Sequence, residues 1–309
     1  MIPLTPGHCH PWADLLAVSF ARTPAEMVQL LAWLQAGPGL IAYGAWDGEC
    51  LAAQYSCRLT PLYLPHHDSP ATVGLSINMA VHPQYRGRGL IKQVAAPVYA
   101  EVGARGGLAG VGFSNADGVK VDRQSRGYGY RVVGKLASTI VWLIRPARLS
   151  HVTLTDHWPQ ATFTPATRSS AHIHFQHTPE NLYHRFACHP FRQYHFGVWQ
   201  DAGEICGLVV YRPVRYRGIR GVALLAVYGP DLPALLAGWA AALCAQGMRF
   251  IQVVTSHHAP IRSLLPRLGM AVTLPYSRSP HYLTAKAFTT TPAALFDYPQ
   301  WDCIGGDIL

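Results

Sequence analysis

The sequence predicts a mixed α/β protein of two tandem domains, each with a central, mostly antiparallel sheet flanked by helices. Three observations lead to this prediction. The chain has 309 residues, which is enough for two domains of ordinary size. Half of the residues are hydrophobic and 13% are charged, so the chain can bury large cores. Helix-like and strand-like segments also follow one another in nearly the same order twice, which indicates a weak internal repeat.

The first half opens with a helix whose start is marked by three residues. Thr23 can cap the helix, Pro24 fits the first helical position, and Glu26 can complete a capping box. After this helix the chain reads as two strands joined at Asp47-Gly48, followed by further alternating elements. The expected segments are strands at 40–46, 50–59 and 71–81, a helix at 90–104, and strands at 108–114 and 137–144.

The two halves are separated by residues 145–170, which are rich in Pro, Thr and Ser and lack steady periodicity. A second helix start follows at Thr178-Pro179-Glu180. The later segments are strands at 195–200, 204–214 and 218–228, a helix from Asp231 to about Gln246, a strand at 249–255, a helix near 259–268 and strands near 271–275 and 281–288. We therefore expect domains at 1–146 and 171–309 and a linker at 147–170, with an aromatic and acidic tail at 289–309.

Composition narrows the classes of function. The net charge of +9 suits an anionic ligand, but basic residues are not interleaved with aromatic residues as in nucleic-acid-binding proteins. No apolar stretch approaches the roughly 20 residues of a membrane span, and the N-terminus lacks the pattern of a signal peptide. The seven cysteines are scattered without a C-x-x-C pair, which favours free thiols in a cytoplasmic protein. The 16 histidines show no zinc-binding spacing, so we expect no metal.

The stretch from Met79 to Leu90, M-A-V-H-P-Q-Y-R-G-R-G-L, is the most informative part of the sequence. A predicted strand ends at Val81, a tight loop follows, and a predicted helix begins near Leu90. Gly87 and Gly89 let the loop backbone turn sharply and approach a ligand closely. The first amides of the helix then point outward, and the helix dipole adds partial positive charge. This arrangement suits the binding of a pyrophosphate.

The stretch resembles the CoA-binding loop of the GNAT N-acetyltransferases. The family pattern, [Q/R]-x-x-G-x-[G/A] between a strand and a helix, is matched by Gln84-x-x-Gly87-x-Gly89. Residues 108–115, which end in G-F-S-N, resemble the next strand of the family. Residues 129–134, G-Y-R-V-V-G, resemble the step into its final hairpin. The resemblance is close over 71–135 and looser beyond.

This resemblance implies acetyl-CoA as the acyl donor. The residues implied to bind it are Met79, Ala80, Val81, Gln84, Arg86, Gly87, Arg88, Gly89, Leu90, Ile91 and Asn115. Arg86 and Arg88 would add positive charge without disturbing the loop amides. Asn115 would begin the next helix and face CoA, although a helix cap without ligand contact also explains it.

Two departures from the family leave the general acid and base open. Many relatives place a Tyr four residues before the Gly-aromatic pair as the acid, but this position holds Ser125. Many also carry a Glu on the strand before the loop as the base, but residues 71–81 contain no carboxylate. Tyr128, His82 and Tyr85 remain catalytic candidates only, and a structural role explains each of them better.

The second half resembles the family only in outline. Its segment at the loop position, residues 226–233, reads A-V-Y-G-P-D-L-P and lacks the glycine pattern. Pro230 and Pro233 have no amide hydrogen to offer a pyrophosphate, and Asp231 would repel it. We therefore expect this half to bind no CoA and to shape the acceptor site.

The C-terminal tail supplies candidate acceptor ligands. Asp297, Trp301 and Asp302 combine negative charge with an aromatic ring, which suits a cationic or sugar-like molecule. The alternative is that the tail packs on the protein to cover apolar strands.

Taken with the resemblance, these features imply an acyl-CoA-dependent N-acetyltransferase. It would transfer an acetyl or short acyl group directly to a primary amine of a small molecule, such as an amino sugar or an amino acid derivative. One alternative is a non-catalytic acyl-CoA-binding protein or sensor, which the departures favour. A second is an aminoacyl transferase acting on peptidoglycan precursors, which the intact CoA loop disfavours. The acyl length and the oligomeric state stay open at this point.

Overall fold

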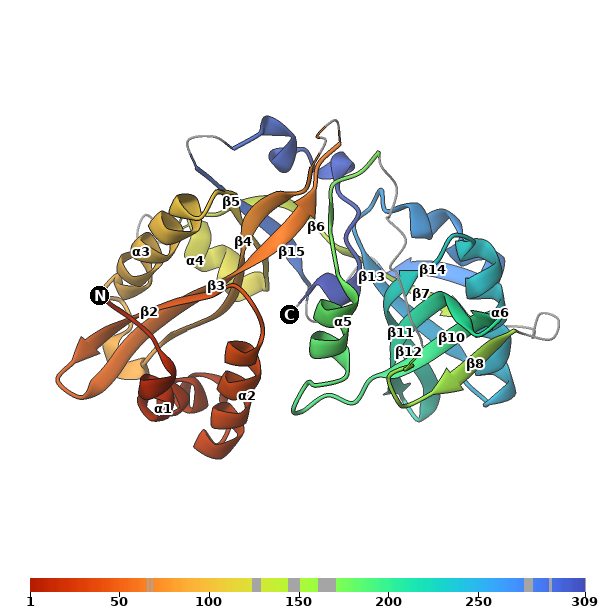
Figure 1. Cartoon of the computed structure of the whole chain (residues 1–309), viewed down its shortest axis with the longest axis horizontal. Helices are drawn as coiled ribbons and strands as arrows, with labels where there is room; N and C mark the ends of the chain where they lie inside the picture. The colour runs from red at the N-terminus through yellow and green to blue at the C-terminus, as the bar shows by residue number, and fades with distance from the viewer. Residues whose placement is uncertain are drawn as a thin grey trace. The chain divides into compact units, whose positions relative to one another are not determined.

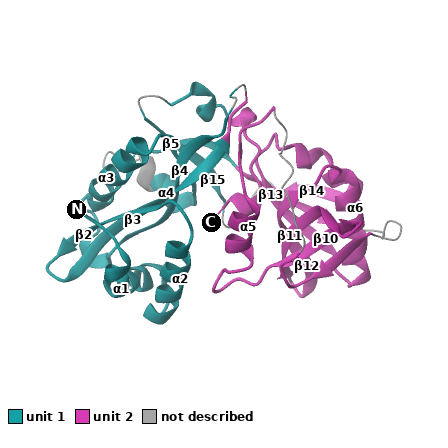
Figure 2. Ribbon diagram, viewed as in Figure 1, with its two compact units in different colours: residues 1–62, 67–135, 279–297 teal, residues 63–66, 136–278, 298–309 magenta. Residues whose placement is uncertain are grey.

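The computed structural model of the chain describes residues 1–65, 67, 69–123, 129–143, 151–160, 171–274, 280–288 and 291–308, the last three residues of the 116–123 helix as backbone only. It divides into two compact units (Figure 2). Unit 1 comprises residues 1–62, 67–135 and 279–297, and unit 2 comprises residues 63–66, 136–278 and 298–309. Each unit holds one mixed sheet flanked by helices, which confirms the predicted fold class.

Unit 1 is built on a sheet with the strand order β1-β2-β3-β4-β5-β15-β6 (Figure 1). Only the β4–β5 pair is parallel among these neighbours. Helix α3 lies on one face, and α1 and α2 pack together on the other. The strands are β1 Ile2–Pro3, β2 Leu40–Asp47, β3 Cys50–Tyr63, β4 Ala71–Val81, β5 Gly107–Ser114, β6 Arg131–Lys135 and β15 Tyr282–Ala287. The helices are η1 Pro6–His8, α1 Cys9–Phe20, α2 Pro24–Ala36, η2 Pro83–Tyr85, α3 Leu90–Ala104, α4 Ala116–Arg123 and η4 Ala293–Phe296.

Local signals explain why the helices of unit 1 begin where they do. The capping box of α2 forms as predicted, since Glu26 N donates to Thr23 Oγ1 over 3.2 Å and Thr23 N donates to Glu26 Oε2 over 2.8 Å.

Helix α1 was not predicted. Pro11 stands in its first turn, where a missing amide hydrogen costs nothing. The helix is fixed by buried apolar residues, among them Trp12 and Leu16.

Unit 2 repeats this plan with the strand order β14-β7-β13-β12-β11-β10-β8. Its one parallel pair among these neighbours is β12–β13. The strands of this sheet are β7 Ala137–Trp142, β8 Val152–Thr155, β10 His195–Asp201, β11 Glu204–Tyr216, β12 Ile219–Tyr228, β13 Phe250–Thr255 and β14 Met270–Leu274. The two-residue strand β9 His174–Phe175 is not part of it and pairs with β3. The helices are α5 Pro179–Phe186, α6 Leu232–Ala245, η3 Pro260–Ser263, α7 Leu265–Leu268, η5 Tyr298–Gln300 and η6 Gly305–Asp307.

The structure differs from two expectations in unit 2. Within the predicted linker at 147–170, residues Val152–Thr155 form β8 and pair with β10, so this part of the chain belongs to the sheet. The single helix expected near 259–268 is two short turns, η3 and α7, each with a proline at its start. Proline fits the first turn of a helix but disrupts a helix interior, so the second proline starts a new turn and does not continue the first.

The two sheets exchange one strand each. β15, from near the end of the chain, lies between β5 and β6 in the sheet of unit 1. β7, which follows β6 after one residue, lies between β13 and β14 in the sheet of unit 2. The hairpin expected after Gly129-Tyr130 therefore does not form, because its two strands pair in different sheets.

Candidate functional site

A bulge in β4 sets the geometry of the candidate site in unit 1. The register between β3 and β4 shifts at Tyr55 and Ser56, and the extra residue is Asn78, with φ of +31°. Gln54 Nε2 donates to Asn78 O over 2.6 Å. Ser56 Oγ donates to Ile77 O over 2.9 Å and to Asn78 O over 3.1 Å. Gln54 and Ser56 are both fully buried, so two side chains of β3 hold the bulge in place.

The strands β4 and β5 separate shortly before the bulge. Their paired residues run from Thr72 and Gly107 to Leu75 and Val111, although both strands continue further. The opening holds a cavity of about 90 Å³. Its lining residues are Ser76, Ile77, Asn78, Met79, Gly112, Phe113, Ser114, Tyr130 and Thr284. Backbone groups that leave a ladder need other partners, so this opening can bind an extended, hydrogen-bonding ligand.

A group of hydroxyls lies beside the cavity. Tyr55 Oη donates to Ser76 Oγ over 2.8 Å, and Tyr99 Oη donates to Tyr55 Oη over 2.9 Å. Tyr130 Oη lies 3.5 Å from Tyr55 Oη. Burial raises the pKa of Tyr55 well above its usual value, so this hydroxyl stays protonated. Ser76 and Tyr130 therefore connect the cavity to an internal chain of hydroxyls.

The predicted phosphate loop follows β4 directly. Gly87 and Gly89 have φ of +78° and +72°, and α3 begins at the next residue, Leu90. A side chain added at Gly87 would meet no atom within 4 Å, so the loop is open on that side. Arg86 Nε donates to Val81 O over 3.4 Å. A 15-residue helix that begins beside an exposed glycine loop has its first backbone amides at that end, an arrangement that suits an anion.

Of the loop's other side chains, Arg88 packs back on the loop itself. Its guanidinium lies 4.9 Å from the centre of the Tyr85 ring and donates to Gln84 O over 3.3 Å. Arg86, Gly87 and Arg88 are all exposed. The two guanidinium groups therefore hold the loop and add positive charge at its surface.

Two of the three candidate catalytic side chains, His82 and Tyr85, make hydrogen bonds within unit 1. His82 Nδ1 accepts a hydrogen bond from Gln84 N over 3.4 Å. Tyr85 Oη donates to Asp47 Oδ2 over 2.8 Å, and this bond raises the pKa of Tyr85. Neither residue lines the cavity between β4 and β5. Tyr128, like Ser125, lies outside the described residues.

Asn115 stands at the start of α4, as the sequence indicated. Its Oδ1 accepts a hydrogen bond from Gly118 N over 2.8 Å, so the side chain caps the helix. Asn115 is exposed and follows Ser114, which lines the cavity.

The matching region of unit 2 is arranged differently. Asp231 Oδ1 accepts a hydrogen bond from Ala234 N over 2.9 Å at the start of α6, which places a carboxylate where unit 1 has its open loop. The pairs between β12 and β13 end at Leu224 and Val253, and η6 packs against both strands there. Gly306 has no room for a side chain beside the Leu225 carbonyl.

The tail joins unit 2 through backbone hydrogen bonds. Ser256 N donates to Cys303 O over 3.0 Å, and Asp302 N donates to Ile173 O over 2.8 Å. Trp301 is fully buried and Asp302 is 7% exposed, so both candidate acceptor ligands lie inside the unit. Their burial supports the alternative, a tail that covers the core. Asp297 is exposed and ends the part of the chain that belongs to unit 1.

Among the described parts of the chain, no group of three or more His, Cys, Asp or Glu residues is placed to hold a metal ion. Within the same ranges no helix has both the length and the apolar character that crossing a membrane requires.

Comparison with known proteins supports the family resemblance. Residues 1–143 match the model of an acetyltransferase (GNAT) domain. No curated protein matches the chain.

Several solved structures share the fold over most of the chain. A probable N-acyltransferase from Enterococcus faecalis V583 is 15% identical, with 94% of this chain and 72% of that chain covered and a TM-score of 0.68. A GCN5-related N-acetyltransferase from Anabaena variabilis is 10% identical, with 91% and 70% covered and a TM-score of 0.62. Eis1 from Mycobacterium abscessus is 15% identical, with 93% and 74% covered and a TM-score of 0.59. These likenesses extend the shared fold to both units.

Proposed function

We propose that the chain is an acyltransferase of the GNAT family, whose acetyltransferase domain model residues 1–143 match, and that it transfers an acetyl group from acetyl-CoA to a primary amine of a small molecule. The observation that carries the proposal is the position of the cavity between β4 and β5. Met79 lines the cavity, β4 ends at Val81, and the glycine loop follows the strand directly. The cavity and the predicted anion site thus follow one another along the chain.

The loop fits the pyrophosphate of CoA. Gly87 and Gly89 give an open turn with positive φ, and the N-terminus of α3 supplies outward amides and partial positive charge. Arg86 and Arg88 add two exposed cations beside it. Residues 84–91 would hold the phosphates, and the backbone of Met79–Val81 would hold the pantetheine arm.

The cleft would position the thioester for direct attack by the amine. A backbone amide of β4 that points into the opening would polarise the thioester carbonyl as an oxyanion donor. Holding amine and thioester together supplies much of the acceleration, on the order of 7–11 kcal/mol in favourable cases. The amine must lose one proton, which water can relay, and the departing thiolate must gain one.

A non-catalytic acyl-CoA-binding protein is the second candidate. One observation favours it: the residues lining the cavity include no carboxylate and no histidine. Release of free CoA thiol in the presence of amine acceptors separates the two functions. Turnover with any member of a panel of amino sugars, amino acids and polyamines supports the transferase, and binding without turnover across the panel supports the sensor.

We assign CoA to unit 1 alone, with unit 2 shaping the choice of acceptor. Asp231 occupies the helix start in unit 2, and η6 packs where its central strands separate.

We also place the protein in the cytoplasm. All seven cysteines lie in described residues and no disulfide joins them.

Calorimetric titration with acetyl-CoA tests the assignment. We expect one site per chain, and we expect Gly89→Asp to abolish binding because its carboxylate would repel the pyrophosphate. Gly218→Asp is the matched control, since Gly218 also has positive φ, at +82°, and open space around it, but lies in unit 2. Two equivalent sites, or equal affinity in wild type and Gly89→Asp, would contradict the assignment.

A further inference from the structure

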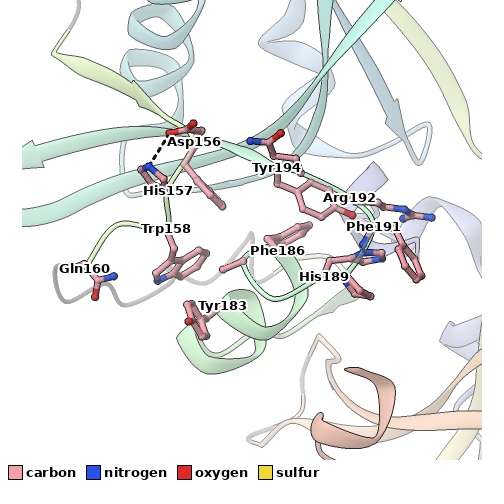
Figure 3. A pocket seen from close by; sticks show the side chains of 14 residues that line it. Asp156, His157, Trp158, Gln160, Tyr183, Phe186, His189, Phe191, Arg192 and Tyr194 are labelled. Carbon is pink, nitrogen blue, oxygen red and sulfur yellow. Dashed lines mark hydrogen bonds and ion pairs between the residues drawn. The ribbon is translucent and has the colours of Figure 1, made fainter. Parts of the chain in front are cut away.

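Unit 2 contains a large open cavity that the proposed acyl transfer does not use. Its volume is about 640 Å³, within the range typical of small-molecule sites. It lies between α5, the segment that leads from α5 to β10, and residues 156–160 (Figure 3). All of its lining residues belong to unit 2.

Aromatic rings make up much of the cavity wall. The Trp158 ring meets Phe196 edge to face, with centroids 5.4 Å apart, and meets Tyr183 at 5.8 Å. Phe186 and Tyr194 form another edge-to-face pair at 5.1 Å. Such pairs fix the orientation of the rings and leave ring faces for a further partner. Tyr183 is 47% exposed, so the apolar wall opens to solvent.

One end of the cavity is positively charged. Arg192 lies there with Phe191 and His189, as Figure 3 shows, and it is exposed. Burial, together with the charges of Arg192 and Arg185, lowers the pKa of His189 to about 4, so its ring is neutral at pH 7. These groups disfavour a cationic ligand at this end and favour an anion.

The carboxylate of the cavity lies at its other end. Asp156 is 3.4 Å from His157 Nε2, and both side chains are largely exposed, at 52% and 90%. In Figure 3 this pair lies on the left, above Trp158, and Arg192 lies on the right. Negative charge is thus kept apart from the arginine, and the aromatic wall lies between the two ends.

We propose that this cavity binds a small molecule in which an aromatic ring carries an anionic group. The ring would pack among Trp158, Tyr183 and Phe186, and the anion would lie near Arg192. An arginine pairs well with a planar carboxylate or phosphate, because its donors form a fixed fork. The inference does not rest on the acetyltransferase activity.

Calorimetry on the full chain tests this site with three probes, indole-3-acetate, benzoate and phenyl phosphate. We expect at least one of them to bind with a Kd below 1 mM and one site per chain. Tryptamine keeps the indole ring but carries a positive charge, and cyclohexaneacetate keeps the carboxylate but lacks an aromatic ring. Each should bind at least tenfold more weakly than the best probe.

Variants locate the site. Arg192→Gln and Trp158→Leu should each weaken the best probe at least tenfold, and Arg215→Gln should leave it unchanged, because Arg215 is an exposed arginine of β11 away from the cavity. Thermal unfolding confirms that each variant is folded, and Phe191→Leu replaces Trp158→Leu if the latter unfolds. Failure of all three probes, equal binding of tryptamine, or full affinity in folded Arg192→Gln would overturn the proposal.

Discussion

Asn78 shows how much a single residue can determine in this chain. The segment 71–81 was predicted as a strand, and it is one, but its bulge was not predicted. The sequence did hold a signal, because Asn is among the few residue types that adopt positive φ readily. The partners of the bulge, Gln54 and Ser56, belong to another strand, so no local pattern could identify them.

Tyr130 is the aromatic residue of the cavity whose hydroxyl joins the internal chain. If the Tyr130 hydroxyl donates the proton that the departing thiolate must gain, Tyr130→Phe should lower kcat by about a hundredfold, since proton transfer by a placed side chain contributes at least that much. The affinity for acetyl-CoA should change little. Steady-state kinetics and calorimetry measure the two effects.

Tyr43→Phe is the control for Tyr130→Phe. The Tyr43 hydroxyl is bonded to Glu101 in the same unit and does not line the cavity. An unchanged kcat in Tyr130→Phe would show that this hydroxyl only supports packing.

His189 makes the stability of unit 2 depend on pH below neutrality. Its pKa is lowered to about 4 in the folded chain, below the value of 6.5 usual for histidine. Between these two pH values the unfolded chain binds more protons, so the stability contributed by neutral His189 is present above about pH 6.5 and is lost as the pH falls towards 4. We expect His189→Gln to lose less stability than wild type between pH 7 and pH 4.

Urea unfolding at several pH values measures that difference. The comparison with wild type isolates His189 from the other histidines, which both proteins share. Parallel curves for the two proteins would show that His189 is not held in its neutral form by the fold.

At the scale of elements, the sequence predicted local structure well and long-range partners poorly. Helix α3 was predicted at 90–104 and is found there, because its start and end depend on nearby residues. Strand β8 was missed because four residues give too short a pattern, and it forms by pairing with β10. For the tail the sequence left two interpretations open, ligand binding and packing on the protein, because acids and aromatics suit both.

Trp301 tests the structural role of the tail. It is fully buried in unit 2, so we expect Trp301→Ala to lower the free energy of unfolding by about 3–5 kcal/mol. Tyr216→Ala, at a site 58% exposed in the same unit, should cost much less. Denaturant unfolding measures both. Unchanged stability with a raised KM for the acceptor would instead restore Trp301 as an acceptor ligand.

For the whole molecule, the strand exchange has a consequence for where the chain can be divided. β6 ends at Lys135, and β7 begins after Leu136 alone, so the local sequence is that of a hairpin. A pairing partner is a property of the complete fold, and the same strand patterns suit either sheet. The expected boundary at residue 146 would leave β7 with unit 1 and remove β15 from it.

The register of β15 suggests a way to separate unit 1. Tyr282 pairs directly with Lys135, so a two-residue Asn-Gly turn that replaces residues 136–281 would join β6 to β15 as an ordinary hairpin. We expect this shortened chain, ending at Asp297, to fold and to bind one acetyl-CoA. Residues 1–146 alone should aggregate, because β5 and β6 would each lose the partner that β15 provides. Circular dichroism, size-exclusion chromatography and calorimetry compare the two chains. If residues 1–146 fold and bind acetyl-CoA while the hairpin chain does not, then β15 is dispensable and the boundary at residue 146 is the correct one.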